Sequence, residues 1–345
     1  MSAEEYQEII RGITAGLKGD FQEDCKYLLD KMKEYKDHEY GTEIVRACGR
    51  LLQDLAPDDM KKDLIETMHQ EVHNYFLGLQ TVAEEARFNI YKKNWPKALE
   101  LIESVVDNLE NEFLTFDDDK VSEYHFFHNI LEEIIYKELF KPTKEVRAIP
   151  EDYAEIYYLY GAILFELKRY DEAEAALKKA LRINPVRTDI ISELTEVYKI
   201  KKEWDEYLIL SRRMLDCSYT SESVAKALRN LGYYYSEQRE FDTAVAVYLF
   251  SNQFEQSYLV NSELMYIQQQ TGKQIVPPSQ EEMRQIFSMH DIPMGANKDV
   301  LGIAYTLAVE AEKQDIKDAA RFFYNVVFDL TGDEEIRKRI EKFEN

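Results

Sequence analysis

The sequence is poor in the residues that interrupt regular structure. Its 345 residues include 12 glycines and 8 prolines, too few for the many tight turns of an all-β protein. Glutamate, lysine, leucine and alanine, which favour helices, are abundant instead. Because 45% of the residues are hydrophobic, the chain can bury a substantial core and is not expected to be disordered. The composition predicts a folded, helical protein.

Cysteine is also scarce, and long apolar runs are missing. The three cysteines, Cys25, Cys48 and Cys217, show no paired spacing. Such a count argues against a disulfide framework and favours a reducing compartment. The amino terminus MSAEEYQEIIRG has no basic region followed by an apolar run, and no stretch approaches the length of a membrane span. These absences predict a cytoplasmic protein without a signal peptide.

Positive charge is in deficit. The chain has 43 lysines and arginines against 66 aspartates and glutamates, a formal net charge of −23. Nucleic acids and anionic membranes are therefore unlikely partners in physical terms, because both are bound through cationic side chains. The charge itself has two interpretations. It either serves solubility alone or attracts a basic partner.

Sequence patterns for catalysis are missing too. The chain contains no GxGxxG, GxxxxGK[ST] or GxSxG motif. The densest titratable feature is Glu66, His69 and His73 at helical spacing, with His125 and His128 three apart on another predicted helix. These side chains could ligate a transition metal. A second Glu-x-x-His element is missing, however, so we expect no metal, no cofactor and no catalytic residue.

The clearest pattern that is present covers Ala154–Pro185, AEIYYLYGAILFELKRYDEAEAALKKALRINP. It predicts two amphipathic helices that are joined by a tight turn at Lys168 and Arg169 and closed by a proline. The positions that set the pattern recur at helical spacing in both helices: Tyr157, Tyr160, Gly161 and Leu164, then Tyr170, Ala173, Leu177 and Ala180.

This segment resembles a tetratricopeptide repeat. It has that family's large, large, small, large pattern in the first helix and its aromatic, small, large, small pattern in the second. The small residues Gly161 and Ala173 are expected where the two helices approach most closely. The resemblance implies an all-α fold, a right-handed α-α superhelix in which successive hairpins stack.

Further copies follow the best one. Residues 225–251 repeat the pattern well, and a degenerate copy begins at Thr188, where Tyr207 replaces the second helix's small residue. Because Tyr207 is large, we expect looser or rotated packing there. A last copy begins near Val300, with Ile316, Ala319 and Phe323 in core register, before a C-terminal capping helix.

The first half of the chain shows a similar repeat spacing, but its residues match the family pattern less well. Gly12, Gly49 and Ala86 are each 37 residues apart, and residues 120–140 have a helical pattern. We therefore predict about nine helical hairpins plus the capping helix. Residues 1–150 are expected to hold degenerate repeats, and residues 151–345 a tetratricopeptide-repeat domain. The break at residues 276–279 precedes a helix that Ser279 and Glu282 could cap.

In the resembled family, the first helix of each hairpin lines a concave groove. Its exposed positions here combine an aromatic wall with a small basic cluster, which could hold an extended peptide or a partner's helix. An arginine could then contact a carboxylate of that partner. The tyrosines could instead pack between repeats, and the cations could pair with nearby glutamates. The candidate binding residues are Tyr158, Phe165, Lys199, Lys226, Arg229 and Tyr233.

These features favour a non-catalytic scaffold that binds a protein or peptide in the groove. Tyr158 and Ala162 occupy the places of the Lys and Asn with which some family members clamp an acidic peptide terminus, so chaperone-tail binding is not supported. Two alternatives stay open. One is a bacterial regulatory receptor for a signalling peptide, although no basic recognition helix precedes the repeats. The other is a metal-dependent enzyme that uses the histidines.

Overall fold

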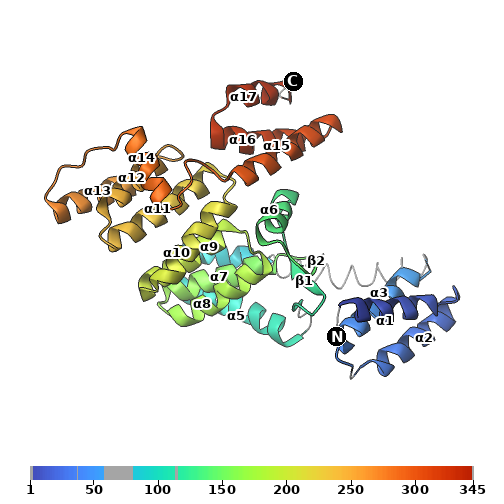
Figure 1. The fold of residues 1–345 in the computed structure, drawn as a ribbon. Helices are drawn as coiled ribbons and strands as arrows, with labels where there is room; N and C mark the ends of the chain where they lie inside the picture. Colours follow the sequence, from blue (N-terminus) through green and yellow to red (C-terminus); the bar gives the residue numbers. More distant parts are fainter. Residues whose placement is uncertain (1–2, 37, 58–80, 113–115, 344–345) are drawn as a thin grey trace. The chain divides into compact units, whose positions relative to one another are not determined.

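The computed structural model describes residues 3–36, 38–57, 81–112 and 116–343 (Figure 1). The chain forms two compact units. The first comprises Met1–Phe126 and Pro142–Asp152, and the second comprises Phe127–Lys141 and Tyr153–Asn345. None of the helices described is both long enough and apolar enough to span a membrane.

The second unit consists of helices, most of which pair with their neighbours in sequence. They are α6 (Ile130–Phe140), α7 (Tyr153–Glu166), α8 (Tyr170–Ile183), α9 (Thr188–Lys201), α10 (Trp204–Cys217), α11 (Ser221–Glu237), α12 (Phe241–Ser251), α13 (Tyr258–Thr271), α14 (Gln280–Met289), α15 (Lys298–Lys313), α16 (Lys317–Thr331) and α17 (Glu334–Ile340), with a 3₁₀ turn at Glu341–Phe343. α7 packs on α8, α9 on α10, α11 on α12, and α15 on α16. α8 also packs on α9, and α10 on α11, so hairpins stack. The predicted helical-repeat solenoid is confirmed.

Glycine is required where two helices of a hairpin cross. A Cβ on Gly161 would lie 2.5 Å from Cγ of Leu177, and one on Gly232 would lie 2.8 Å from the ring of Tyr248. Real Cβ atoms do not make such short contacts, because packed interiors leave no room for an extra atom. The predicted role of Gly161 at the closest approach is confirmed.

In the degenerate hairpin α9–α10, the large and small side chains are distributed differently where the two helices cross. α9 and α10 place Thr195, Tyr207 and Ser211 at the positions that Gly161, Ala173 and Leu177 occupy in α7 and α8. All three are buried, and the Tyr207 side chain is only 1% exposed. The large and small side chains of the second helix are exchanged, so Tyr207 is accommodated without leaving the core.

In the part of the chain that the structure describes, five hairpins share the same type of turn. In each, a residue in the left-handed conformation comes two positions before the second helix, and the next backbone N–H donates to the carbonyl five residues back at 2.8–3.0 Å. This is the hydrogen bond that ends many helices after a left-handed residue. The left-handed residues are Lys93, Lys168, Lys202, Arg239 and Asp315.

The first of these turns lies in the first unit. It joins the helical residues 81–91 to α5 (Trp95–Glu112). Ala86, Ala98 and Ile102, which the sequence pattern places at the core positions, are fully buried. The sequence prediction of a repeat-like hairpin here agrees with both the turn and the burial.

The turn also explains a wrong prediction in the last copy. Ile316, Ala319 and Phe323 were expected in core register, and Phe323 is buried. Ile316, however, is 49% exposed and Ala319 is half-buried, whereas Ala320 and Tyr324 are fully buried. Asp315 adopts the left-handed conformation and Ile316 completes the turn. α16 therefore begins at Lys317, one residue later than the prediction requires.

The rest of the first unit contains α1 (Ala3–Ala15), α2 (Phe21–Glu34) and α3 (Gly41–Leu55). Their shared core includes Ile13, Leu28 and Ile44. A Cβ on Gly12 would meet no described atom within 4 Å, and one on Gly49 would make an ordinary contact of 3.7 Å with Met32. These two glycines therefore lack the packing role of Gly161. The assignment of residues 1–150 to degenerate repeats stays a prediction.

Two short strands were not predicted. β1 (Ser122–His125) pairs in parallel with β2 (Glu145–Ala148) within the first unit. The side chains of Asp118 and Asp119 accept hydrogen bonds from the backbone of residues 121, 122 and 124, which holds this segment out of a helix. Asn129 then caps α6 by accepting from the backbone N–H of Glu132.

The helix predicted over residues 120–140 is therefore wrong in its first half. His125 lies on β1, and His128 lies in the connection before α6. The two histidines do not share a helical face, and the geometry proposed for a metal pair on one helix is lost.

Candidate functional site

The first helices of the stacked hairpins lie next to one another in the second unit. α7 contacts α9, α9 contacts α11, and α11 contacts α13. We call the side of these four helices that carries the predicted binding residues the first-helix face. It is defined by Tyr158, Glu193, Lys199, Lys226, Tyr233 and Glu263.

The predicted residues on α7 are held by packing. The guanidinium of Arg187 lies 5.3 Å from the ring centroid of Tyr158, and Arg187 also donates to Glu155 and Asp189. Burial, together with these carboxylates, raises the pKa of Tyr158 to about 12. Phe165 is half-buried, and its ring lies 5.5 Å from that of Tyr170. The chain's own side chains therefore contact and partly cover this end of the face.

The centre of the face brings two predicted residues together. The Lys199 ammonium lies 4.2 Å from the ring centroid of Tyr233, although the residues are far apart in sequence. It also lies 3.4 Å from the carboxylate of Glu196. Tyr233 in turn lies 6.2 Å from Trp204 and 6.1 Å from Tyr207, measured between ring centroids.

The basic cluster expected from the sequence is partly neutralised. Arg229 donates to Glu255 at 2.9 Å, so its charge is balanced within the chain. Lys226 forms no ion pair with the described residues, but its charge lowers the pKa of Glu193. The structure therefore leaves Lys226 as the available cation of this cluster.

Carboxylates outweigh cations on the face. Burial raises the pKa of Glu193, and Glu196, Glu166 and Asp189 raise it further against the effect of Lys226. Burial and the carboxylates of Glu237, Glu263 and Glu196 raise the pKa of Tyr233 to about 12. A half-buried carboxyl whose pKa is raised by burial and by neighbouring carboxylates is typical of functional surfaces.

Some buried polar atoms beneath the face lack partners. Oγ of Ser192 and Oγ of Ser236 form no hydrogen bond with any residue that the structure describes, and both side chains are buried. Nη1 of Arg229 is in the same situation. Groups of this kind are rare in native proteins, since each costs about 1–3 kcal/mol.

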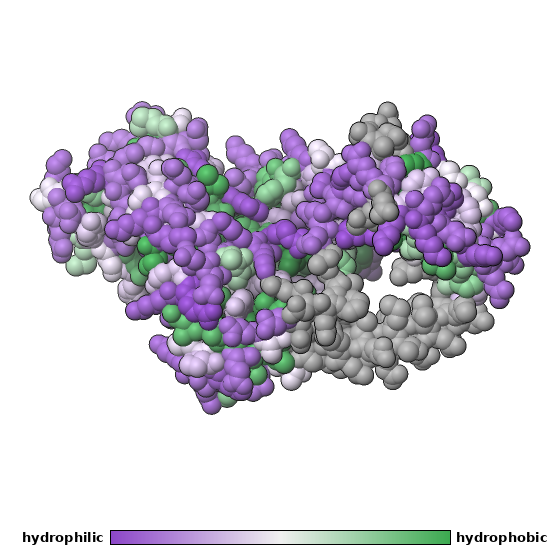
Figure 2. Space-filling view, turned by 90° about the horizontal axis from the view of Figure 1, so that it is seen from below, coloured by the Kyte–Doolittle hydropathy of each residue, from purple (hydrophilic) through white to green (hydrophobic). Residues whose placement is uncertain are grey.

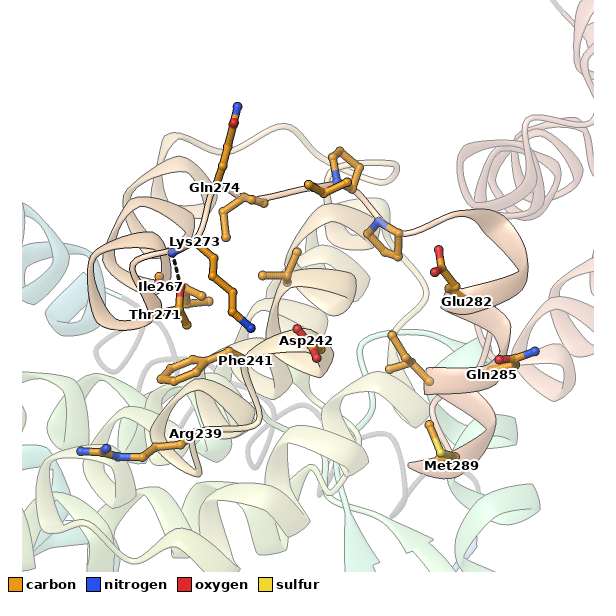
Figure 3. A pocket seen from close by; sticks show the side chains of 16 residues that line it. Arg239, Phe241, Asp242, Ile267, Thr271, Lys273, Gln274, Glu282, Gln285 and Met289 are labelled. Carbon is orange, nitrogen blue, oxygen red and sulfur yellow. Dashed lines mark hydrogen bonds between the residues drawn. The ribbon is translucent and has the colours of Figure 1, made fainter.

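A separate hollow of about 600 Å³ lies between the start of α12, the end of α13, residues 273–278 and α14 (Figure 3). Its walls combine apolar side chains, such as Val245 and Ile286, with charged ones. The side chains of Lys273 and Asp242 point toward one another across it (Figure 3). Ser279 and Glu282 form the predicted capping box at the start of α14, which fixes one wall.

The described residues give little support to the metal-dependent alternative. His69 and His73 lie outside the described residues. His125 is buried on β1, and His128 lies 3.4 Å from the carboxylate of Glu132. Within residues 3–36, 38–57, 81–112 and 116–343, no group of three or more His, Cys, Asp or Glu side chains could hold a metal ion.

Sequence reasoning missed several of the residues that shape the face. Trp204 and Tyr207 belong to a second helix, which was not expected to contribute to it. Glu263 lies on α13, whose sequence shows no repeat pattern. Glu193 directly follows a predicted groove position, so an inspection of charge along each first helix could have found it.

Comparison with known proteins supports the repeat. Residues 154–187 match the family model described as tetratricopeptide repeat. The match spans α7, the shared turn and α8, the hairpin in which Gly161 makes its close approach. No curated protein matches the chain.

Proposed function

We propose that this chain, a tetratricopeptide-repeat protein, is a non-catalytic scaffold that binds a protein or peptide along its first-helix face. Tetratricopeptide repeats are protein-interaction modules. The single observation that supports this role most is the continuous row of first helices, α7, α9, α11 and α13, with half-buried aromatic and charged side chains on one side.

The aromatic residues on the face are suited to anchoring a partner. Trp204 and Tyr233 are half-buried and held by ring contacts, so a ligand would not have to order them. Binding energy in interfaces is concentrated in such Trp, Tyr and Arg side chains. On the side of the molecule that Figure 2 shows, hydrophilic residues predominate and hydrophobic ones form separate small areas. On the first-helix face itself, the charged side chains of Lys199 and Glu196 lie beside these aromatic residues. A polar surface with a few aromatic anchors supports peptide recognition.

The test is a selection from a random peptide library against the wild-type chain. The Tyr233→Ala variant tests the face, and Tyr91→Ala, which removes an exposed tyrosine of the first unit, is the matched control. We expect selected peptides to lose at least 10-fold in affinity for Tyr233→Ala, since an anchor is worth 2 kcal/mol or more. They should bind Tyr91→Ala like wild type. Equal affinity for wild type and Tyr233→Ala would contradict the proposal.

A further inference from the structure

Three rings form an aromatic wall in the middle of the first-helix face. The ring centroids of Trp204, Tyr207 and Tyr233 lie 5.8–6.2 Å from one another. Tyr207 is the buried member of the wall, whereas Trp204 and Tyr233 are half-buried and reach solvent. The face of an aromatic ring carries partial negative charge and attracts cations, tryptophan and tyrosine most strongly.

Three carboxylates surround this wall. Glu196, Glu237 and Glu263 each raise the pKa of both Tyr207 and Tyr233 through their charge, which places them close to the two rings. Neither Glu237 nor Glu263 forms an ion pair with a lysine, arginine or histidine that the structure describes. Rings and carboxylates together therefore make a strongly negative site.

The chain places one of its own cations in this site. The Lys199 ammonium lies 4.2 Å from the Tyr233 ring centroid, well inside the roughly 6 Å reach of a cation–π contact. Its ion pair with Glu196 is 3.4 Å long, and both side chains are about one-third exposed. An exposed pair of this kind contributes little energy, so Lys199 is a replaceable occupant. One lysine also leaves two of the three carboxylates unbalanced.

The other cations of the face do not favour an acidic ligand. Arg229 is paired with Glu255, and Arg187 is paired with Glu155 and Asp189. Lys226 forms no ion pair with a described residue, but it lies close enough to Glu193 to lower that residue's pKa. A ligand carboxylate would have to break the arginine pairs or reach Lys226 beside Glu193, and it would approach Glu237 and Glu263 as well. A ligand cation meets these carboxylates directly, and the net charge of −23 attracts it from a distance.

We propose that the aromatic wall of Trp204 and Tyr233, with Glu196, Glu237 and Glu263, binds the lysine or arginine side chain of a basic peptide segment. Lys199 occupies this cation site in the free protein and swings out when the peptide binds. The inference rests on the proposed function, because it names the partner chemistry of the same face. The lysine stem is flexible, so the exchange requires no change in the helices.

Trp204 provides a direct readout of binding. The chain contains two tryptophans, so Trp95→Phe leaves Trp204 as the sole indole fluorophore. The probe is an acetylated and amidated heptapeptide of alternating alanine and lysine. Its matched controls carry norleucine, which is uncharged, or glutamate at the lysine positions. We expect saturable fluorescence changes with the lysine peptide alone, which weaken as salt is raised.

Variants separate the site from general electrostatics. Lys199→Met removes the internal competitor and should tighten the lysine peptide by about 3- to 10-fold, from the usual range of a cation–π contact plus an exposed ion pair. Lys298→Met changes the net charge equally at an exposed lysine elsewhere and should have little effect. Tyr233→Leu and the double variant Glu237→Gln/Glu263→Gln should each weaken the peptide by at least 10-fold. Glu206→Gln, on the exposed side of α10, is the control for lost negative charge.

The outcomes distinguish this inference from the proposed function. If Lys199→Met does not tighten the lysine peptide, or if the glutamate or norleucine peptide binds equally well, the cation site is overturned. A library peptide without lysine or arginine that still depends on Tyr233 would also overturn it, while leaving the binding role of the face in place. Thermal melting of each variant in parallel checks that folding is intact.

Discussion

The hairpins α7–α8 and α9–α10 are built on the same turn but pack their crossings differently. Both reverse direction through a left-handed lysine, Lys168 or Lys202, with the same backbone hydrogen bond. The first hairpin places Gly161 against Leu177, whereas the second buries Tyr207 and compensates with the small Ser211 four residues later. One type of turn therefore serves both hairpins, while side-chain volume is distributed differently at their two crossings.

The largest effect on stability is expected when the tyrosine that distinguishes the second hairpin is removed. Tyr207→Ala should lower the free energy of unfolding by about 3–5 kcal/mol, because it leaves a large cavity at a buried crossing. Urea denaturation followed by circular dichroism measures the change. If the loss is below about 1 kcal/mol, Tyr207 does not fill the crossing of α9 and α10.

The converse change overfills the first hairpin. Gly161→Leu should destabilise the chain by about 1–3 kcal/mol, because even a Cβ at this position would collide with Leu177. Gly302→Leu is the matched control, since no described atom lies within 4 Å of a Cβ there. That control should be neutral or slightly stabilising, because leucine favours a helix over glycine. Equal losses in both variants would contradict the close approach at Gly161.

The two hairpins also differ in charge at one matched position. α7 buries Leu159 where α9 has Glu193, whose pKa is raised mainly by burial. In the folded state Glu193 holds its proton to a higher pH than in the unfolded chain, so its contribution to stability is lost as the pH rises above about 4.3. Glu193→Gln should therefore raise Tm by a few degrees at pH 7 and have a smaller effect near pH 4. A larger gain at pH 4 than at pH 7 would show that the sign is wrong.

The smallest effect on stability is expected at the left-handed turn residue that both hairpins have in common. Lys168→Gly and Lys202→Gly should each stabilise the chain by about 0.5–1 kcal/mol, because glycine adopts the left-handed conformation without steric cost. The mid-helix control Lys179→Gly should destabilise by about 1 kcal/mol. If urea denaturation shows different changes in the free energy of unfolding for Lys168→Gly and Lys202→Gly, the two hairpins do not have the same type of turn.

Much of the repeat architecture could be predicted, because it depends on local spacing. Gly161, Ala98 and Ile102 occupy the core positions that the repeat pattern assigns to them. The register of α16 was harder to predict, since α16 begins with Lys317, whereas the second helices of the other hairpins with this turn begin with an aromatic residue. None of these turns has a glycine at its left-handed position, so no glycine marks where α16 begins.

The candidate site was less predictable, because its contacts join residues that are far apart in sequence. Lys199 contacts Tyr233 only after two hairpins have stacked, and Arg229 contacts Glu255 only after α11 and α12 have paired. Which partner a long, flexible side chain contacts depends on the distances between elements in the folded chain. The strands β1 and β2 were missed for a similar reason. They depend on aspartate side chains that bind nearby backbone amides rather than on a run of alternating residues.

Hydrogen exchange of the wild-type chain, with and without a library-selected peptide, tests the central claim most directly. The account predicts that bound peptide slows exchange in α9, α11 and α13, whose neighbouring surfaces form the first-helix face. The α15–α16 hairpin and the α1–α3 helices should exchange as they do without peptide. Slowed exchange confined to those regions, with α9 and α11 unchanged, would contradict the assignment of the first-helix face as the binding surface.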